Sequence, residues 1–190
     1  MAVCESSTEK KTNFGACQIT NAMKTIYILR HAKSSWDTPN LIDHQRPIIE
    51  KGIKRTMLIG DYLAKNNIKT GLMISSDAVR AFETSKLIAA AIGYPIESIK
   101  TDHRIYLEGG RHIFEVINDV PQKIDSIMIV GHNPTLTNFV NDFTDDSIEW
   151  LPTSGIVSIS FETDDWKEIT GATSTLNFAV YPKQLKEKTD

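Results

Sequence analysis

Cysteine, long apolar runs and an excess of one charge are all scarce in this chain. Its two cysteines, Cys4 and Cys17, both lie near the N-terminus, so a disulfide-stabilised fold is not supported. No segment approaches the ~20 consecutive apolar residues of a membrane-spanning helix, and residues 1–22 lack the apolar stretch of a secretory signal. The formal net charge of −3 offers no broad basic field to nucleic acid. We therefore expect a cytoplasmic protein that binds neither a membrane nor nucleic acid.

The length and composition suit one globular domain. A chain of 190 residues with 41% apolar and 24% charged residues can bury a substantial core. Residues 1–22 mix charged residues with Ser, Thr and Asn, and we interpret them as a disordered or non-native extension, with Met23 as a candidate start. Residues 23–190 are then expected to form the single domain.

Strand and helix patterns alternate along the rest of the chain. Three apolar runs, at 25–29, 72–74 and 126–130, have the length and content of buried strands. Each leads, directly or after a loop, into a helical pattern. This alternation predicts an α/β fold with a mainly parallel sheet and helices on both faces. Further strands are expected at 156–161 and 176–181, with at least one of them antiparallel.

The predicted helices carry start and stop signals. Apolar residues at a spacing of four predict the first helix over 48–66. In the second, Asp77 is expected to cap the N-terminus, and Gly93 supplies the stop. In the third, Asn133 is expected to be the cap, with Pro134 in the first helical position.

Each of the three predicted parallel strands ends in a polar tip. The tips hold Arg30-His31, residues 75–77 and Gly131-His132, and the carboxyl ends of strands are where open α/β sheets bind ligands. Phosphoryl transfer requires cations around the phosphoryl oxygens and an in-line nucleophile. A neutral His31 can be that nucleophile, and the planar Arg30 guanidinium matches phosphate geometry. Nearby arginines would disfavour the imidazolium form.

Two side chains from later tips add to this pattern. Arg80 falls in the first turn of the second helix, where the helix N-terminus also favours an anion. His132 can donate a hydrogen bond to a phosphoryl oxygen. The competing interpretation is a metal site formed by His31 and His132 with His103 or His112. No spacing resembles a zinc or two-metal signature, and the arginines would repel a cation, so no metal is expected.

Four short motifs together resemble the histidine phosphatase superfamily. They are residues 29–36 (LRHAKSSW), 43–47 (DHQRP) with Gly52, 75–81 (SSDAVRA) with Thr84, and 131–134 (GHNP). The resemblance covers roughly residues 24–182 and is greatest to the SixA-type phosphohistidine phosphatases. It implies a three-layer α/β/α sandwich of the phosphoglycerate mutase-like kind, without a metal or organic cofactor. It also implies that His31 is the phosphorylated nucleophile, and that Arg30, Arg80 and His132 complete the phosphate pocket.

Departures from the wider family bear on the substrate. Ala32 and Lys33 stand where the wider family usually has glycine and an acidic residue. The insertions that enclose substrate in the mutases are missing, which favours hydrolysis. Glu108 is the nearest candidate for a general acid by position, although it also fits an exposed loop carboxylate. Imidazole has an ordinary pKa of about 6.5 and leaves after modest protonation, so a site without a strong acid favours P–N cleavage over ester cleavage.

The sequence therefore predicts a metal-independent phosphatase that acts on protein phosphohistidine, with a phosphohistidine-bearing protein domain as its partner. A small-molecule phosphomonoesterase with the same site and a non-catalytic phosphate-binding module remain as alternatives. Arg46 and Lys33 are further candidates for the pocket, and Trp36 for its rim. The remaining histidines are expected at the surface: His44, His103 and His112.

Overall fold

A six-stranded sheet organises the structure, a computed structural model that describes residues 23–36, 41–107 and 109–186. The predicted extension at 1–22 lies outside the described residues. The strands are β1 (Lys24–Arg30), β2 (Leu72–Ser75), β3 (Lys100–Thr101), β4 (Ser126–Gly131), β5 (Ile156–Phe161) and β6 (Ser174–Val180). Across the sheet they lie in the order β3-β2-β4-β1-β5-β6.

The sheet is mainly parallel, as the alternation of elements predicts. β4 pairs in parallel with β1 on one side and with β2 on the other, and β2 also pairs in parallel with β3. β5 runs antiparallel to both of its neighbours, β1 and β6. The carboxyl ends of β1, β2 and β4 therefore lie side by side at one edge. The expectation of at least one antiparallel strand near the C-terminus is confirmed by β5.

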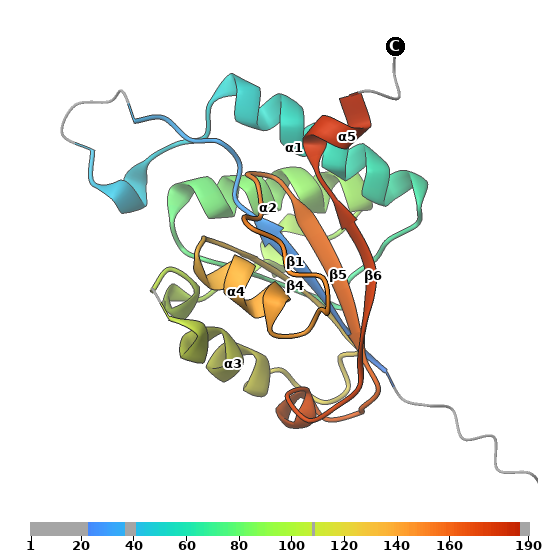
Figure 1. The fold of residues 1–190 in the computed structure, drawn as a ribbon. Helices are drawn as coiled ribbons and strands as arrows, with labels where there is room; N and C mark the ends of the chain where they lie inside the picture. The colour runs from blue at the N-terminus through green and yellow to red at the C-terminus, as the bar shows by residue number, and fades with distance from the viewer. Residues whose placement is uncertain (1–22, 37–40, 108, 187–190) are drawn as a thin grey trace, which may run out of the picture.

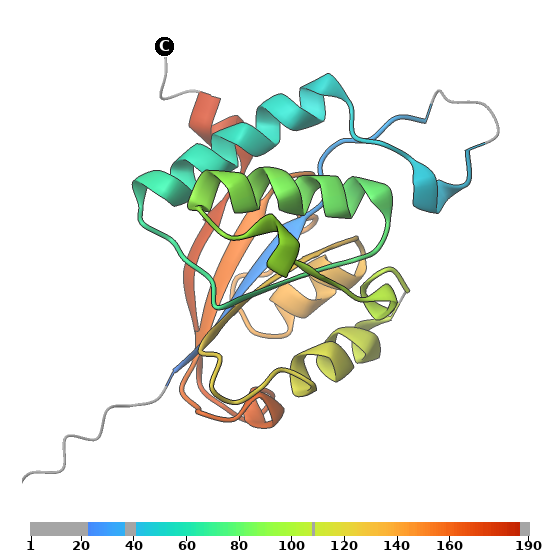
Figure 2. The same cartoon turned by 180° about the vertical axis from the view of Figure 1, so that it is seen from behind.

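Helices cover both faces of the sheet and complete the predicted α/β/α sandwich (Figures 1 and 2). The helices are α1 (Glu50–Lys65), α2 (Val79–Ile92), α3 (Gly110–Asn118), α4 (Thr135–Asn141) and α5 (Pro182–Lys186). α1, α2 and α5 lie on one face, and α3 and α4 on the other. β1 serves both layers because successive side chains alternate: Ile26 and Ile28 join the core under α3 and α4, whereas Tyr27 and Leu29 join the core under α1 and α2.

The sequence patterns did not predict β3, α3 or the short C-terminal helix α5. β3 is only two residues long and depends on its pairing with β2. α3 begins just after Gly109, which has a φ of 120°, and has no side-chain cap hydrogen bond. A signal for α3 was present, because Ile113, Val116, Ile117 and Val120 follow the helical spacing and are all buried. None of the helices described is both long and apolar enough to cross a membrane.

Both predicted side-chain caps are wrong. The N-cap of α2 is Ala78, and no side chain caps it; the Asp77 carboxylate instead interacts with two imidazoles described below. In α4 the N-cap position belongs to Pro134, and Asn133 donates from Nδ2 to the carbonyl of Leu151. Asp77 and Asn133 thus bind tertiary partners, which a local capping pattern does not reveal.

The segment that follows β1 is held against the start of α1. Ile49 donates from its backbone N–H to the carbonyl of Lys33, and Ser34 forms an isolated antiparallel bridge with Ile48. Gly52 faces the same backbone: a Cβ there would meet Lys33 O and would lie 3.0 Å from Lys33 N. Glycine at this position therefore permits the close approach of helix and loop.

Replacing Gly52 tests this packing. Gly52→Ala should lower the free energy of unfolding by roughly 1–3 kcal/mol, because a methyl group would push against backbone that has little room to move. Gly110→Ala is the matched control, since a Cβ there meets nothing within 4 Å. Urea unfolding followed by circular dichroism compares the two variants with the wild type. If Gly52→Ala were as stable as Gly110→Ala, the close approach of Gly52 to the Lys33 backbone would not require glycine.

Candidate active site

An open pocket of about 770 Å³ lies at the carboxyl ends of β1, β2 and β4. It concentrates positive charge in a chain whose formal net charge is −3. The basic side chains that line it are Arg30, Lys33, Arg46, Arg55 and Arg80. Asp43 is the acidic side chain among the described lining residues. The pocket therefore favours an anionic ligand.

His31 follows β1 directly and is buried in the pocket wall, with 9% of its surface exposed. Its Nδ1 lies 2.7 Å from the carbonyl oxygen of Ala32. Because a carbonyl oxygen can only accept, the hydrogen is on Nδ1, and Nε2 carries the lone pair. Burial, together with the charges of Arg80, Arg30 and Arg46, lowers the pKa of His31 to about 3 despite the hydrogen bond to Ala32, which acts to raise it. At neutral pH this imidazole is an uncharged nucleophile.

The arginines that the sequence pointed to are only part of the reason why His31 is neutral. The sequence pointed to neighbouring arginines, and their charges do act on His31. Burial is nevertheless the largest cause of the lowered pKa. The strand-end position itself thus keeps the imidazole uncharged, and the arginines add to this effect.

His132 lies beside His31, with the two ring centroids 4.9 Å apart. Its Nε2 is 2.9 Å from Ser76 Oγ, which already accepts a hydrogen bond from the Ala78 backbone N–H. The Ser76 hydroxyl can donate its own hydrogen to Nε2, and in that arrangement the ring hydrogen of His132 is on Nδ1. That Nδ1 is buried without a partner among the described residues. Burial and then the interaction with His31 lower the pKa of His132 to about 2, so it too is neutral.

Two arginines from different elements point their charge into the same region. Arg30 donates from Nη1 to the Leu151 carbonyl, and burial followed by the charge of Arg80 lowers its pKa. Arg80, only 5% exposed, lies in the first turn of α2. The Nε of each arginine is buried and has no hydrogen-bond partner among the described residues. Buried donors of this kind are costly unless a ligand satisfies them.

Asp43 connects the arginines of the pocket. Its carboxylate accepts from Arg46 Nη1 at 2.7 Å, from Arg80 Nη2 at 2.8 Å and from the Tyr106 hydroxyl at 3.0 Å. Arg80 Nη1 also donates to the Asp43 carbonyl at 2.6 Å. Burial acts to raise the pKa of Asp43, but the bonds from Arg46 and Tyr106 and the charge of Arg80 outweigh it and lower the pKa to about 2. Asp43 therefore orients the arginines and is not a proton donor at neutral pH.

Arg46 and Lys33 both line the pocket, as predicted, and Arg46 also braces the loop after β1. It donates from Nε to the Ser35 carbonyl and from Nη2 to Ser34 Oγ. The Trp36 ring, 78% exposed, lies over the Arg46 guanidinium, whose central carbon is 3.2 Å from the ring centroid. Trp36 thus stands at the pocket rim and holds Arg46 in place.

The structure brings His31, Arg30, Arg80 and His132 into one pocket, although their sequence positions span about a hundred residues. Glu108 lies outside the described residues. Asp43 falls in the motif at 43–47 but had no predicted role, and neither did Ser76 or Tyr106. Asp43 had a usable signal, because an acidic residue three positions before Arg46 can pair with it.

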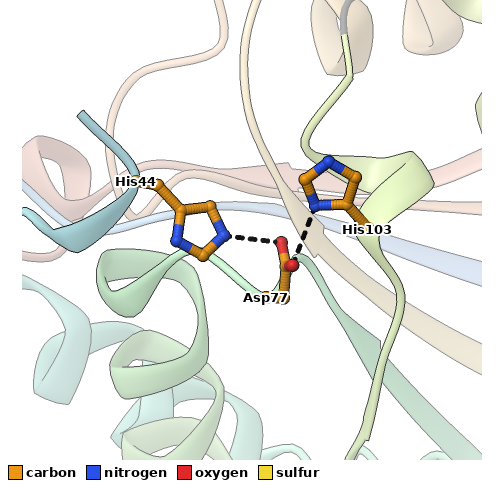
Figure 3. Close-up of side chains that lie close together, drawn as sticks. All are labelled: His44, Asp77 and His103. Carbon is orange, nitrogen blue, oxygen red and sulfur yellow. Dashed lines mark hydrogen bonds and ion pairs between the residues drawn. The ribbon is translucent and has the colours of Figure 1, made fainter. Parts of the chain in front are cut away.

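Two of the three histidines expected at the surface instead gather around Asp77. The Asp77 carboxylate lies 2.9 Å from His44 Nε2 and 2.8 Å from His103 Nδ1 (Figure 3). Of the three histidines, His103 is exposed as predicted, whereas His44 and His112 are half-buried. His112 pairs with Glu115 on α3 and stays away from the pocket. Among the described residues, neither His103 nor His112 forms a ligand group with His31 and His132, which is the metal centre considered as the competing interpretation.

The sequence also matches the model of the histidine phosphatase superfamily (branch 1) over residues 26–104. A crystal structure assigned as the phosphohistidine phosphatase SixA from Agrobacterium tumefaciens is 25% identical, with a TM-score of 0.70 over 84% of this chain and 98% of that one. In both sequence and fold, the chain resembles the histidine phosphatase superfamily. The predicted resemblance is confirmed at that level.

Two further comparisons extend this resemblance. Phosphoglycerate mutase from Bacillus anthracis shares the fold, with a TM-score of 0.62 at 12% identity over 88% of this chain and 97% of that one. An uncharacterized chloroplastic protein of Arabidopsis thaliana is 31% identical over 64% of this chain. The match spans 60% of that relative's length.

The two buried imidazoles should stay neutral through the physiological pH range. Both pKa values lie below the ordinary value, so lowering the pH from about 8 to about 5 crosses the ordinary imidazole pKa of about 6.5 without protonating either ring. NMR of ¹⁵N-labelled histidine, assigned with His31→Gln and His132→Gln, measures this directly. The urea-unfolded chain is the control and should titrate normally, whereas an inflection near the ordinary value in the folded protein would contradict the burial argument.

Proposed function

We propose that this protein is a phosphatase that forms a phosphohistidine on His31 and acts on phosphohistidine in proteins. The observation that carries the proposal is the tautomer of His31, which offers a neutral Nε2 lone pair inside a pocket lined by five basic side chains. The match to the superfamily model and the likeness to a protein assigned as a phosphohistidine phosphatase support the same activity.

In the first step, His31 Nε2 attacks the phosphorus in line and forms an N–P bond. The bond to the leaving group breaks, and its electron pair departs with that group. The unpartnered donors at Arg30 Nε, Arg80 Nε and His132 Nδ1 are available to the phosphoryl oxygens as charge shifts during transfer. The hydrogen bond from His31 Nδ1 to the Ala32 carbonyl stabilises the positive charge that the ring gains on phosphorylation.

In the second step, water attacks the phosphoryl group and breaks the N–P bond. Inorganic phosphate leaves, and the bond electrons return to His31 Nε2, so the neutral imidazole is regenerated. Protein groups and water supply everything that both steps require in this proposal.

The chemistry of the leaving group favours phosphohistidine as the substrate. Asp43 is held as an anion by two arginines, so it cannot protonate a departing alkoxide. A departing imidazole needs only modest protonation, since its ordinary pKa is about 6.5. A pocket whose carboxylate is committed to salt bridges therefore suits P–N cleavage.

The pocket rim suits a protein substrate. Large apolar side chains are exposed near the pocket: Trp36 at 78%, Ile42 at 61%, Trp150 at 52% and Leu107 at 38%. Trp36 and Leu107 line the opening, and Trp150 packs over Arg30. Exposed aromatic and aliphatic groups beside a charged pocket are typical of surfaces that bind another protein.

Trapping the phosphoenzyme tests the proposed nucleophile. Wild-type protein incubated with a ³²P-labelled phosphohistidine protein should gain an acid-labile, base-stable label, and His31→Ala should gain none. His112→Ala is the control and should label like wild type, because His112 lies outside the pocket. Labelling that persists in His31→Ala would overturn the proposed nucleophile.

Removing an oxyanion donor should slow the reaction without abolishing it. Arg80→Ala is expected to lower kcat/KM by roughly 10²–10³-fold, since Arg80 supplies charge to the transferring group. Steady-state kinetics measure the loss, and circular dichroism checks that the variant is folded. A loss in Arg80→Ala no greater than that in Arg111→Ala, an exposed arginine on α3, would remove Arg80 from the mechanism.

Substrate comparison separates the proposal from the alternative, a small-molecule phosphomonoesterase. The pocket volume of about 770 Å³ gives that alternative some support, because it exceeds the needs of a phosphoryl group alone. We expect turnover of a phosphohistidine protein to exceed that of aliphatic phosphomonoesters. Faster turnover of the aliphatic phosphomonoesters, together with loss of that turnover in Glu108→Ala, would favour the phosphomonoesterase.

A further inference from the structure

A second constellation of chemistry-bearing side chains lies next to the pocket but does not line it. His44, Asp77 and His103 come from three separate segments, and their ligating atoms all lie within 4.8 Å of one another. Figure 3 shows the Asp77 carboxylate between the two rings. His44 belongs to the short 3-10 helix Asp43–Gln45, Asp77 to the junction of β2 and α2, and His103 to the 3-10 helix His103–Ile105.

The contact between His44 and Asp77 is close but is not a well-aligned hydrogen bond. His44 Nε2 and Asp77 Oδ1 are 2.9 Å apart, yet both atoms are shielded from solvent and have no hydrogen-bond partner among the described residues. A buried ring nitrogen and a buried carboxylate oxygen that face each other without an aligned hydrogen bond can both be satisfied by a cation between them. By contrast, Asp77 Oδ2 and His103 Nδ1 form a regular hydrogen bond of 2.8 Å.

The charge environment of this group differs from that of the pocket. Within the described part of the chain, the ion pairs of Asp77 are with the two imidazoles, so its charge is not taken up by a guanidinium. Asp43, in comparison, pairs with both Arg46 and Arg80. The repulsion by arginines that argues against a metal at His31 therefore does not apply at Asp77.

We propose that His44, Asp77 and His103 bind one divalent transition-metal ion of the zinc class. Two imidazole nitrogens and one carboxylate oxygen are ligands that such ions prefer, and three protein ligands leave a fourth position open. Zinc–ligand bonds of about 2.0–2.2 Å place tetrahedral ligand atoms roughly 3.3 Å apart. The contacts of 2.8 and 2.9 Å need to open only slightly, and the His103 side chain, 59% exposed, is free to move outward.

The ion would join three segments that also build the pocket. His44 follows Asp43, Asp77 precedes Arg80 by three residues, and His103 precedes Tyr106 by three. Tyr106 packs against both rings, with centroid distances of 5.0 Å to His44 and 5.6 Å to His103, and its hydroxyl donates to Asp43. The ion's role is therefore to hold the pocket wall together, and it takes no part in phosphoryl transfer.

Metal titration tests this site without measuring turnover. The full-length chain is used without a polyhistidine tag and with Cys4→Ser and Cys17→Ser, because thiolates also bind zinc. Zn²⁺ is titrated calorimetrically and Co²⁺ by visible absorption, at about pH 7.5, above the ordinary imidazole pKa of about 6.5. We expect one ion per chain and a higher melting temperature with Zn²⁺ present.

Variants decide where the ion binds. His103→Ala and Asp77→Asn should each weaken binding at least tenfold, since loss of an outer-shell partner alone costs about 10–100-fold. His103 is exposed and Asn matches Asp in shape, so both variants should fold. His112→Ala is the matched control because His112 and Glu115 form a similar imidazole–carboxylate pair without a third ligand. Absence of binding, affinity unchanged in His103→Ala, or binding lost in His31→Gln but kept in His103→Ala would each overturn the site.

Discussion

The parallel pairing of β4 with both β1 and β2 is the constraint on which the candidate active site depends. The register aligns Arg30 with Gly131 and Ser75 with Val130, so the residues that follow each strand emerge at one edge. His31 also donates from its backbone N–H to the carbonyl of Gly131, which extends the pairing one step beyond β1. His31, His132 and Ser76 consequently meet without a dedicated loop to bring them together.

Within the pocket, burial keeps His31 neutral, and charge pairing positions the arginines. The pKa of His31 falls from its ordinary value to about 3, so the folded protein favours the neutral ring over the imidazolium by roughly 5 kcal/mol more than water does. Asp43 offsets part of the charge of Arg46 and Arg80, but the pocket stays positive because it is also lined by Arg30, Lys33 and Arg55. The His132 Nδ1 atom, which has no partner among the described residues, remains available to a ligand. Rigid donors and a neutral nucleophile are thereby held in place before any ligand arrives.

Sequence patterns located the site residues whose position follows from the strand or helix to which they belong. The apolar run before Arg30 and His31 predicted a buried strand with a reactive tip, and β1 and its flanking cores have that arrangement. The same reasoning failed at Asp77 and Asn133, where a helix cap was the expected partner. Local propensity described the backbone there, but the side chains bind His44, His103 and the Leu151 carbonyl, which lie far away in the chain.

By itself, the sequence determined the α/β class, the three polar strand tips and the resemblance to a family, because apolar periodicity and short motifs are local properties. Tertiary structure alone decided that Asp43 anchors two arginines, that burial outweighs the arginines in keeping His31 neutral, and that Asp77 faces two imidazoles. The physical reason is that partner choice and burial depend on which segments the sheet order brings together. Hydrogen bonds and desolvation act over a few ångströms in space, regardless of separation along the chain.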